Sequence, residues 1–123
     1  MVKVKHFLDR VEPDDGYRMW VEPFGLTRDL QEVCRVAYCM KHIAPPMELW
    51  TWFEQHPQGY EYFRGQYHEY LDRRVYGLVL SSLAAAASEE TLTLLHQEED
   101  TKHNTATALA EFLSELAQWK YRE

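Results

Sequence analysis

The amino-acid sequence predicts one α/β domain, and three observations support this fold class. The segment Thr91–His96 is β-branched or apolar up to Leu95, which is typical of a short strand covered on both faces. After an acidic turn, a helix is expected to open at Asp100 or Thr101, because apolar residues then recur at helical spacing. They are Ala106, Leu109, Ala110, Leu113, Leu116 and Ala117. A strand leading into a helix is the βα half of an α/β unit, and 123 residues suffice for one domain.

Two further strands are expected near the start of the chain. Val2–Leu8 alternates apolar and basic side chains, and Tyr17–Val21 is rich in aromatic residues. The loop between them, Asp9–Gly16, ends in a strong turn signal, Asp-Asp-Gly. Because this loop is shorter than an ordinary parallel crossover, the residues alone favour an antiparallel pair.

Four helical segments are expected in the middle of the chain. The first begins after Thr27 and runs to about Lys41, and the second covers Met47–Gln55. Two more carry apolar residues at helical spacing, which are Tyr60, Phe63, Tyr67 and Leu71, then Tyr76, Val79, Leu80, Leu83, Ala84 and Ala87. The core is expected to contain Leu94, Leu95, Leu109, Leu113, Phe63, Tyr67, Val79 and Leu83.

The composition excludes several classes of protein. Hydrophobic content of 46%, with 4 Trp, 8 Tyr and 5 Phe, excludes a disordered chain. A formal charge of −7 argues against nucleic-acid and membrane partners. Cys34 and Cys39, five apart on one expected helix, lie beyond disulfide reach and are read as reduced thiols. With no membrane-spanning run and no signal-peptide apolar region, a cytoplasmic location is expected.

Short motifs in a fixed order run through nearly the whole chain. They are Val2–Lys5, Asp14-Asp15-Gly16-Tyr17-Arg18, Ile43-Ala44-Pro45, Glu48-Leu49, Trp52-Phe53, Pro57, Tyr60, Glu61, Phe63-Arg64, Tyr67, Glu69, Thr93-Leu94-Leu95 and Asp100-x-x-His103-Asn104. With this set the chain resembles a divergent member of the YeaO-like bacterial proteins, the family of domain of unknown function 488. The resemblance implies a single domain over residues 1–123, with a small, mostly parallel three-stranded sheet packed with about five helices. The parallel pairing that the resemblance implies therefore takes precedence over the antiparallel prediction. The resemblance implies no particular reaction and no cofactor.

Two departures from the family pattern change the charge at the strand ends. After the second strand the family typically has Asp-Arg-Leu-Trp-Pro-Arg-Gly, whereas this chain has the shorter Glu22-Pro23-Phe24-Gly25 without either arginine. After the central strand the family typically has Tyr-Ala-Ala-Lys-Asp, whereas here Glu99 replaces the lysine. The loss of three positive charges is consistent with altered specificity or with a lost activity.

The candidate site lies after the central strand, because ligands of α/β folds bind beyond the strands' C-terminal ends. Asp100 is either a helix N-cap or an acidic functional group, and both interpretations remain open. His103, three residues on, is either a packed polar residue or a general base. The residues predict His103 and Asp100 as the catalytic pair, if the site performs chemistry.

Four residues complete the candidate site as ligand-binding groups: Arg18, Glu22, His96 and Asn104. Arg18 can anchor a carboxylate or phosphate, or it can pair structurally with Glu22, Asp15 or Asp100. The imidazole and carboxylate groups after the central strand, from His96, Glu98, Glu99, Asp100 and His103, are of types that bind metals. Their spacing matches no compact zinc signature, so no metal is expected.

Two functions are compatible with these features. One is a pocket for a small polar or cationic ligand, with acid–base chemistry through His103 and an acidic partner. The alternative is a non-catalytic interaction module that assembles through its aromatic-rich helices, for example as a homodimer. Trp52, Tyr62 and Tyr70 fall off the apolar stripes and are the aromatic side chains expected at such an interface.

Overall fold

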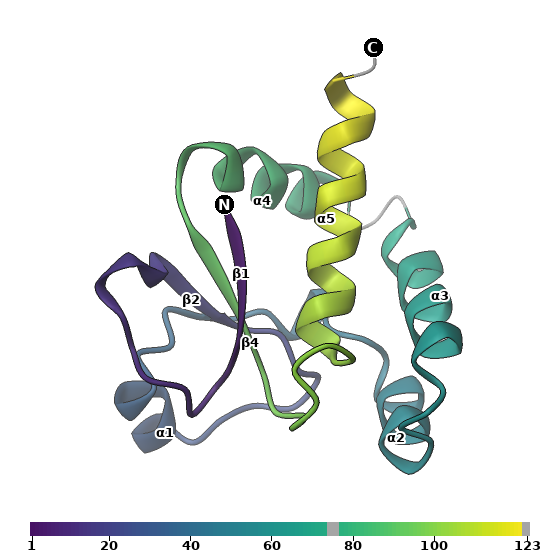
Figure 1. Cartoon of the computed structure of the whole chain (residues 1–123), viewed down its shortest axis with the longest axis horizontal. Coiled ribbons are helices and arrows are strands. Elements are labelled where there is room, and N and C mark those ends of the chain that lie inside the picture. The colour runs from purple at the N-terminus through teal and green to yellow at the C-terminus, as the bar shows by residue number, and fades with distance from the viewer. Residues whose placement is uncertain (74–76, 122–123) are drawn as a thin grey trace.

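The computed structural model describes residues 1–73 and 77–121, and Figure 1 shows its sheet flanked by helices. The strands are β1 (Val2–His6), β2 (Tyr17–Trp20), β3 (Tyr38–Cys39) and β4 (Leu92–His96). The helices are α1 (Arg28–Val33), α2 (Met47–Gln55), α3 (Tyr60–Leu71), α4 (Gly77–Glu89) and α5 (Thr105–Tyr121), with short 3-10 turns at Pro13–Asp15 and Lys41–Ile43. The fold belongs to the predicted α/β class.

Over the described residues the sheet has four strands rather than three, in the order β1-β4-β2-β3, and every pair is parallel. The antiparallel pairing of β1 and β2 is therefore wrong, and the parallel sheet implied by the resemblance is right. A short loop favours an antiparallel pair only where strands consecutive in sequence are also neighbours in the sheet. Here β4 lies between β1 and β2, so their loop only has to return along one short strand.

The turn before β2 depends on Gly16. Its φ angle is 63°, in the region where glycine avoids the strain of a side chain. A Cβ atom at this position would lie 2.1 Å from the carbonyl oxygen of Thr91, which is far too close. Glycine thus lets the start of β2 approach the start of β4, where the amide of Tyr17 donates to Thr91 at 3.1 Å.

The predicted helix from Thr27 to about Lys41 is wrong beyond Val33. The Thr27 hydroxyl caps α1 as expected, accepting the amide of Leu30 at 3.2 Å. After the helix, Arg35 takes a φ of 54°, which turns the chain out of the helical direction. The chain then forms β3, which pairs with β2. Cys34 and Cys39 therefore lie on different elements, and both thiols are free.

The core lies between the sheet and the helices α2–α5. Helix α5 packs against β1 and β4, and helices α3 and α4 pack against α5 (Figure 1). The predicted core residues Leu94, Leu95, Leu109, Leu113, Phe63 and Tyr67 are buried. Val79 and Leu83 are only partly buried, because α4 turns Leu80 and Ala84 to the centre. The predicted helical residue Tyr76 lies outside the described residues.

All five residues of β4 are buried, as predicted for a strand covered on both faces. This strand is the centre of the sheet, and its C-terminal end leads to the candidate site. Among the described residues, none of the helices has the length and apolar character needed to cross a bilayer.

Candidate functional site

Two glutamates lie beyond the ends of neighbouring strands. Trp20 at the end of β2 is in register with Leu95 of β4, and the amide of Val21 donates to the Leu95 carbonyl at 3.3 Å. Glu22 therefore leaves the sheet beside the β4–α5 loop, which carries Glu98. The amide of Gln97 donates to Oε2 of Glu22 at 3.1 Å, so the two strand ends are joined.

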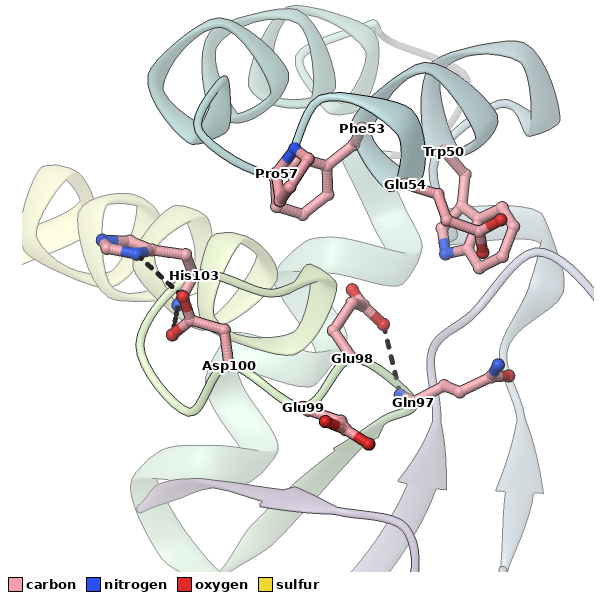
Figure 2. A pocket seen from close by; sticks show the side chains of 9 residues that line it. All are labelled: Trp50, Phe53, Glu54, Pro57, Gln97, Glu98, Glu99, Asp100 and His103. Carbon is pink, nitrogen blue, oxygen red and sulfur yellow. Dashed lines mark hydrogen bonds and ion pairs between the residues drawn. The ribbon is translucent and has the colours of Figure 1, made fainter.

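A cavity of about 340 Å³ opens between this loop and α2 (Figure 2). One wall comes from α2 and the residues after it, and the other from the β4–α5 loop. The lining residues are Trp50, Phe53, Glu54, Pro57, Gln97, Glu98, Glu99, Asp100 and His103. Figure 2 shows aromatic rings on the α2 wall and the Glu98 carboxyl on the opposite wall. Of the nine lining residues, four are acidic and none is Lys or Arg.

Glu22 lies behind Glu98 and away from solvent. Its side chain is fully buried, and no hydrogen-bond donor in the part of the chain that the structure describes reaches its Oε1 atom. Burial raises the pKa of Glu22 well above its ordinary value, and the adjacent Glu98 carboxyl raises it further. Burial also opposes the ionisation of Glu98, but hydrogen bonds from Glu22 and Thr105 outweigh it and lower the pKa of Glu98. The two opposite shifts favour the proton on Glu22 rather than on Glu98.

Helix α5 begins at Thr105, not at Asp100 or Thr101 as predicted. Asn104 is its N-cap, because its Oδ1 accepts the amide of Thr107 at 2.7 Å. Its side-chain amide also donates to the carbonyl of Asp100 at 2.8 Å. Oε1 of Glu98 accepts the amide and the hydroxyl of Thr105, at 2.8 and 2.7 Å, so its charge lies at the positive end of the helix.

Asp100 and His103 form an exposed pair at the rim of the cavity. Oδ1 of Asp100 accepts the amides of Lys102 and His103, at 2.8 and 3.1 Å, which closes a turn before α5. These amides lower the pKa of Asp100. Oδ2 lies 3.2 Å from Nδ1 of His103, and the imidazole ring is 4.9 Å from the ring of Tyr60. Asp100 therefore holds the imidazole of His103 in one orientation and also stabilises the turn before α5.

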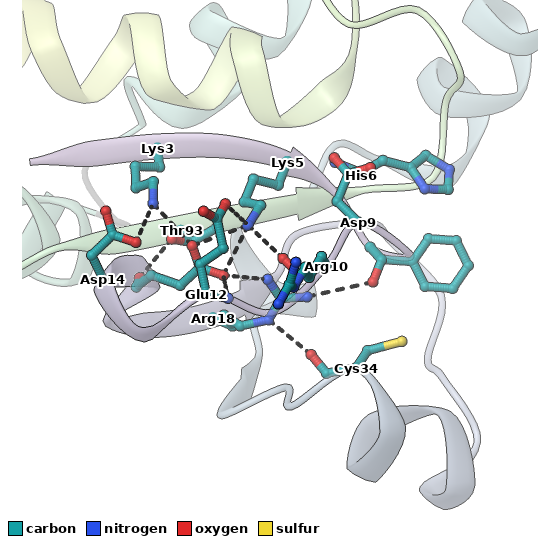
Figure 3. A network of polar contacts seen from close by, with 12 residues as sticks. Lys3, Lys5, His6, Asp9, Arg10, Glu12, Asp14, Arg18, Cys34 and Thr93 are labelled. Carbon is teal, nitrogen blue, oxygen red and sulfur yellow. Dashed lines mark hydrogen bonds and ion pairs between the residues drawn. The ribbon is translucent and has the colours of Figure 1, made fainter.

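Arg18 lies outside the cavity, at the other end of β2 (Figure 3). It is 2% exposed, its Nη1 lies 2.7 Å from Oδ2 of Asp15, and its Nε donates to the carbonyl of Cys34 at 2.8 Å. Lys3 and Lys5 also contact Asp15, at 2.9 and 3.1 Å. Arg18 therefore forms the structural pair that the sequence offered as an alternative to an anchoring role.

His96 is buried at the end of β4 and does not line the cavity. Burial lowers its pKa, and its Nδ1 has no hydrogen-bond partner among the described residues. Its ring contacts that of His6 edge-on at 5.7 Å, so it lies on the β1 side of β4. Among the described residues there is also no group of three or more His, Cys, Asp or Glu side chains arranged to hold a metal.

The structure thus gathers some predicted site residues and separates others. Asp100 and His103 line the cavity, Glu22 and Asn104 lie behind it, and Arg18 and His96 lie elsewhere. Trp50, Phe53 and Glu54 were missed, because α2 is distant in sequence from β4. Glu98 was not predicted as a site residue, although its position directly after the central strand was a usable signal.

Comparisons with known proteins place the chain in a family. The family model described as "Inactive DUF488-N3 subclade" matches residues 1–122. The chain is 28% identical over 116 residues to uncharacterised proteins Rv3073c of Mycobacterium tuberculosis and Mb3100c of Mycobacterium bovis, covering 92% of this chain and 93% of each relative. No solved structure gives a significant match. With nearly its whole length matched, the chain belongs to the DUF488 family, in the subclade described as inactive.

Proposed function

We propose that this domain binds a small organic cation in the cavity between α2 and the β4–α5 loop. The observation that carries the proposal is the pairing of an aromatic wall with an acidic wall. Trp50 and Phe53 stand opposite Glu98, and the cavity volume lies within the range of small-molecule sites. A cation gains from contact with ring faces and from carboxylates at once, whereas an anion gains from neither.

The acidic residues of the lining come from both walls. Glu54 belongs to α2, and Glu98, Glu99 and Asp100 follow β4. Since the described lining contains no lysine or arginine to neutralise them, these carboxylates give the cavity a negative potential. A ligand carrying one positive charge and a compact apolar body fits this surface best.

The family comparison favours binding of the cation without a chemical reaction. The matched subclade is described as inactive, and the chain also lacks the three cationic residues typical of its relatives after the second and central strands. The Asp100–His103 pair then orients the ligand at the rim. Acid–base chemistry through His103 remains the alternative role of that pair.

A pair of isosteric probes tests the proposal. Choline is a permanent cation, and 3,3-dimethylbutan-1-ol has the same shape without the charge. Choline is expected to raise the melting temperature and to give a saturable calorimetric signal, and the alcohol is not. Equal binding of both probes, or of neither, contradicts a cation site.

Matched variants locate the binding. Trp50→Leu and Glu54→Gln are expected to weaken choline binding by about tenfold each, which corresponds to the loss of one cation–π or charge contact. Glu48→Gln removes the same charge from the same helix outside the cavity, and should bind as the wild type does. Asp100→Asn and His103→Gln test the rim pair. Binding that survives all four substitutions in the lining excludes this cavity.

The aromatic surface of α2 and α3 supports a second candidate, a homodimer interface. Trp52 stacks on His56 at 4.7 Å and contacts Tyr62 at 4.7 Å, and Tyr62 is 56% exposed. Exposed aromatic rings held in place by neighbours are typical of interface anchors. Sedimentation of the wild type and of Tyr62→Ser over a range of concentrations tests it, and a monomer at every concentration excludes it.

A further inference from the structure

Glu22 is the buried acid that the proposed binding does not by itself explain. It is fully buried, and its Oε1 meets no hydrogen-bond donor among the described residues. An ionised carboxylate there would leave a charged oxygen unsatisfied in a poorly solvated site, which is strongly unfavourable. A protonated carboxyl avoids this cost, because its hydroxyl can donate to Glu98.

In the pair of Glu22 and Glu98, the proton and the negative charge lie on different residues. Glu98 accepts two hydrogen bonds from Thr105 at the start of α5, so the negative charge is stabilised there. Glu22 accepts the amide of Gln97 and lies further from solvent, so the proton resides on Glu22. Two adjacent carboxyls of this kind hold one proton between them.

The groups around Glu22 provide no positive charge. From α3, Tyr67 faces it and stays neutral, because burial raises the pKa of its hydroxyl. From the end of β4, His96 has its pKa lowered by burial and is neutral as well. The remaining titratable groups of the cavity are Glu54, Glu99, Asp100 and His103. Among the described residues no lysine or arginine lines the cavity, so an incoming ligand can supply a permanent positive charge beside Glu98.

We infer that the cation taken up by this cavity exchanges for the proton that Glu22 and Glu98 share. The inference rests on the proposed function and assigns Glu22 a role in it. A ligand cation against Glu98 favours a second negative charge behind it. The O–H bond of Glu22 then breaks, its proton passes to Glu98 and from there to water in the cavity, and Glu22 is left as a carboxylate. One positive charge enters and one leaves.

Proton release can be measured directly with choline, whose own charge does not change with pH. Titration of the wild type at one pH in phosphate and in HEPES, two buffers with different ionisation enthalpies and no net positive charge, gives the number of protons exchanged. About one proton should be released per choline bound, and the affinity should rise by up to about tenfold per pH unit over the pH range in which the pair still holds its proton.

Glu22→Gln is the decisive variant, because glutamine copies the shape and the donor of a protonated glutamic acid but has no proton to release. Choline binding to this variant should release no proton and should not vary with pH, whereas the control Glu48→Gln should behave as the wild type does. The wild-type calorimetry tests the inference even if the variant fails to fold.

The outcomes separate the two proposals. Choline binding with no proton release and no pH dependence in the wild type overturns the exchange and leaves the cation site intact. Equal proton release by wild type and Glu22→Gln also overturns it. Absence of choline binding at every pH overturns the cation site, and the exchange with it.

Discussion

The two buried acids at opposite ends of β2 are treated in opposite ways. Asp15, before the strand, is surrounded by Lys3, Lys5 and Arg18, and these cations together with an amide hold its pKa below the ordinary value of 3.8 despite its burial. Glu22, after the strand, has no described cation beside it, and burial together with the neighbouring Glu98 carboxyl raises its pKa. A buried acid with its own cations is part of the framework. A buried acid without a neighbouring cation lacks a counter-charge, which a ligand can supply.

The largest effect is expected from removing the charge of Asp15. Asp15→Asn leaves Arg18 buried without a counter-charge, which should lower the unfolding free energy by about 3–5 kcal/mol in urea denaturation. Asp14→Asn is the matched control, since Asp14 is 80% exposed and contacts only Lys3 among the described ion pairs. A loss as small as that of the control would show that the cations are equally stable without Asp15.

The pH dependence of the Asp15 contribution follows from the direction of its pKa shift. Because the folded pKa lies below the unfolded value, the stabilisation is complete above about 3.8 and is lost as the pH falls through the folded pKa. Wild type should therefore lose stability in acid more steeply than Asp15→Asn.

Leu94, which is fully buried in the middle of β4, provides an uncharged comparison for the variants of Asp15 and Glu22. Leu94→Ala should cost about 2–5 kcal/mol, because it leaves a cavity in the core. Unlike the acid variants, its loss should be the same at acidic and neutral pH. A loss below about 0.5 kcal/mol would contradict the central position of this strand.

Glu22→Gln should act in the direction opposite to Asp15→Asn. The folded pKa of Glu22 is raised, so its favourable contribution is complete below the unfolded value of 4.5 and is lost as the pH rises through the folded pKa. Glutamine needs no proton, so the variant should gain on the wild type by about 1.4 kcal/mol per pH unit across that interval. Denaturation at several pH values measures this. A constant difference would mean that Glu22 is ionised in the fold.

The smallest effect concerns the helix end that holds the charge of Glu98. Asn104→Ala should cost about 1 kcal/mol, because the amide of Thr107 loses its acceptor, whereas Asn104→Asp keeps the cap. Thermal denaturation of the two variants compares them. Equal stability of Asn104→Ala and wild type would exclude Asn104 as the cap.

Much of the fold was predictable where a single physical pattern dominates. The unbroken apolar run of β4 and the stripes of α2, α3 and α5 identified those elements, because burial on one or both faces constrains every position. The two residues of β3 carry no pattern of their own and form a strand only because β2 has a free edge. The stripe through α1 continued past Val33 in sequence, but Arg35 turns the chain there.

The candidate site was predictable in location but not in membership. The rule that sites lie beyond strand C-termini pointed to the region of Asp100 and His103, where the structure has the cavity. It could not indicate Trp50 and Phe53, whose approach depends on how α2 packs. It also misplaced Arg18, since a charge near a strand does not reveal which end of the strand it faces. The raised pKa of Glu22 arises only from tertiary burial beside Glu98.

The central place of β4 also sets the order in which the sheet can assemble. β1 and β2 leave the ribosome first, yet neither has its main partner until residues 92–96 have been made. We therefore expect the nascent chain to carry unpaired strand edges until β4 has been made, a period in which such edges invite aggregation. β1 carries Lys3 and Lys5, and charged side chains on an exposed strand discourage incorrect strand pairing. These two lysines can protect β1 in this way until they form their ion pairs with Asp15.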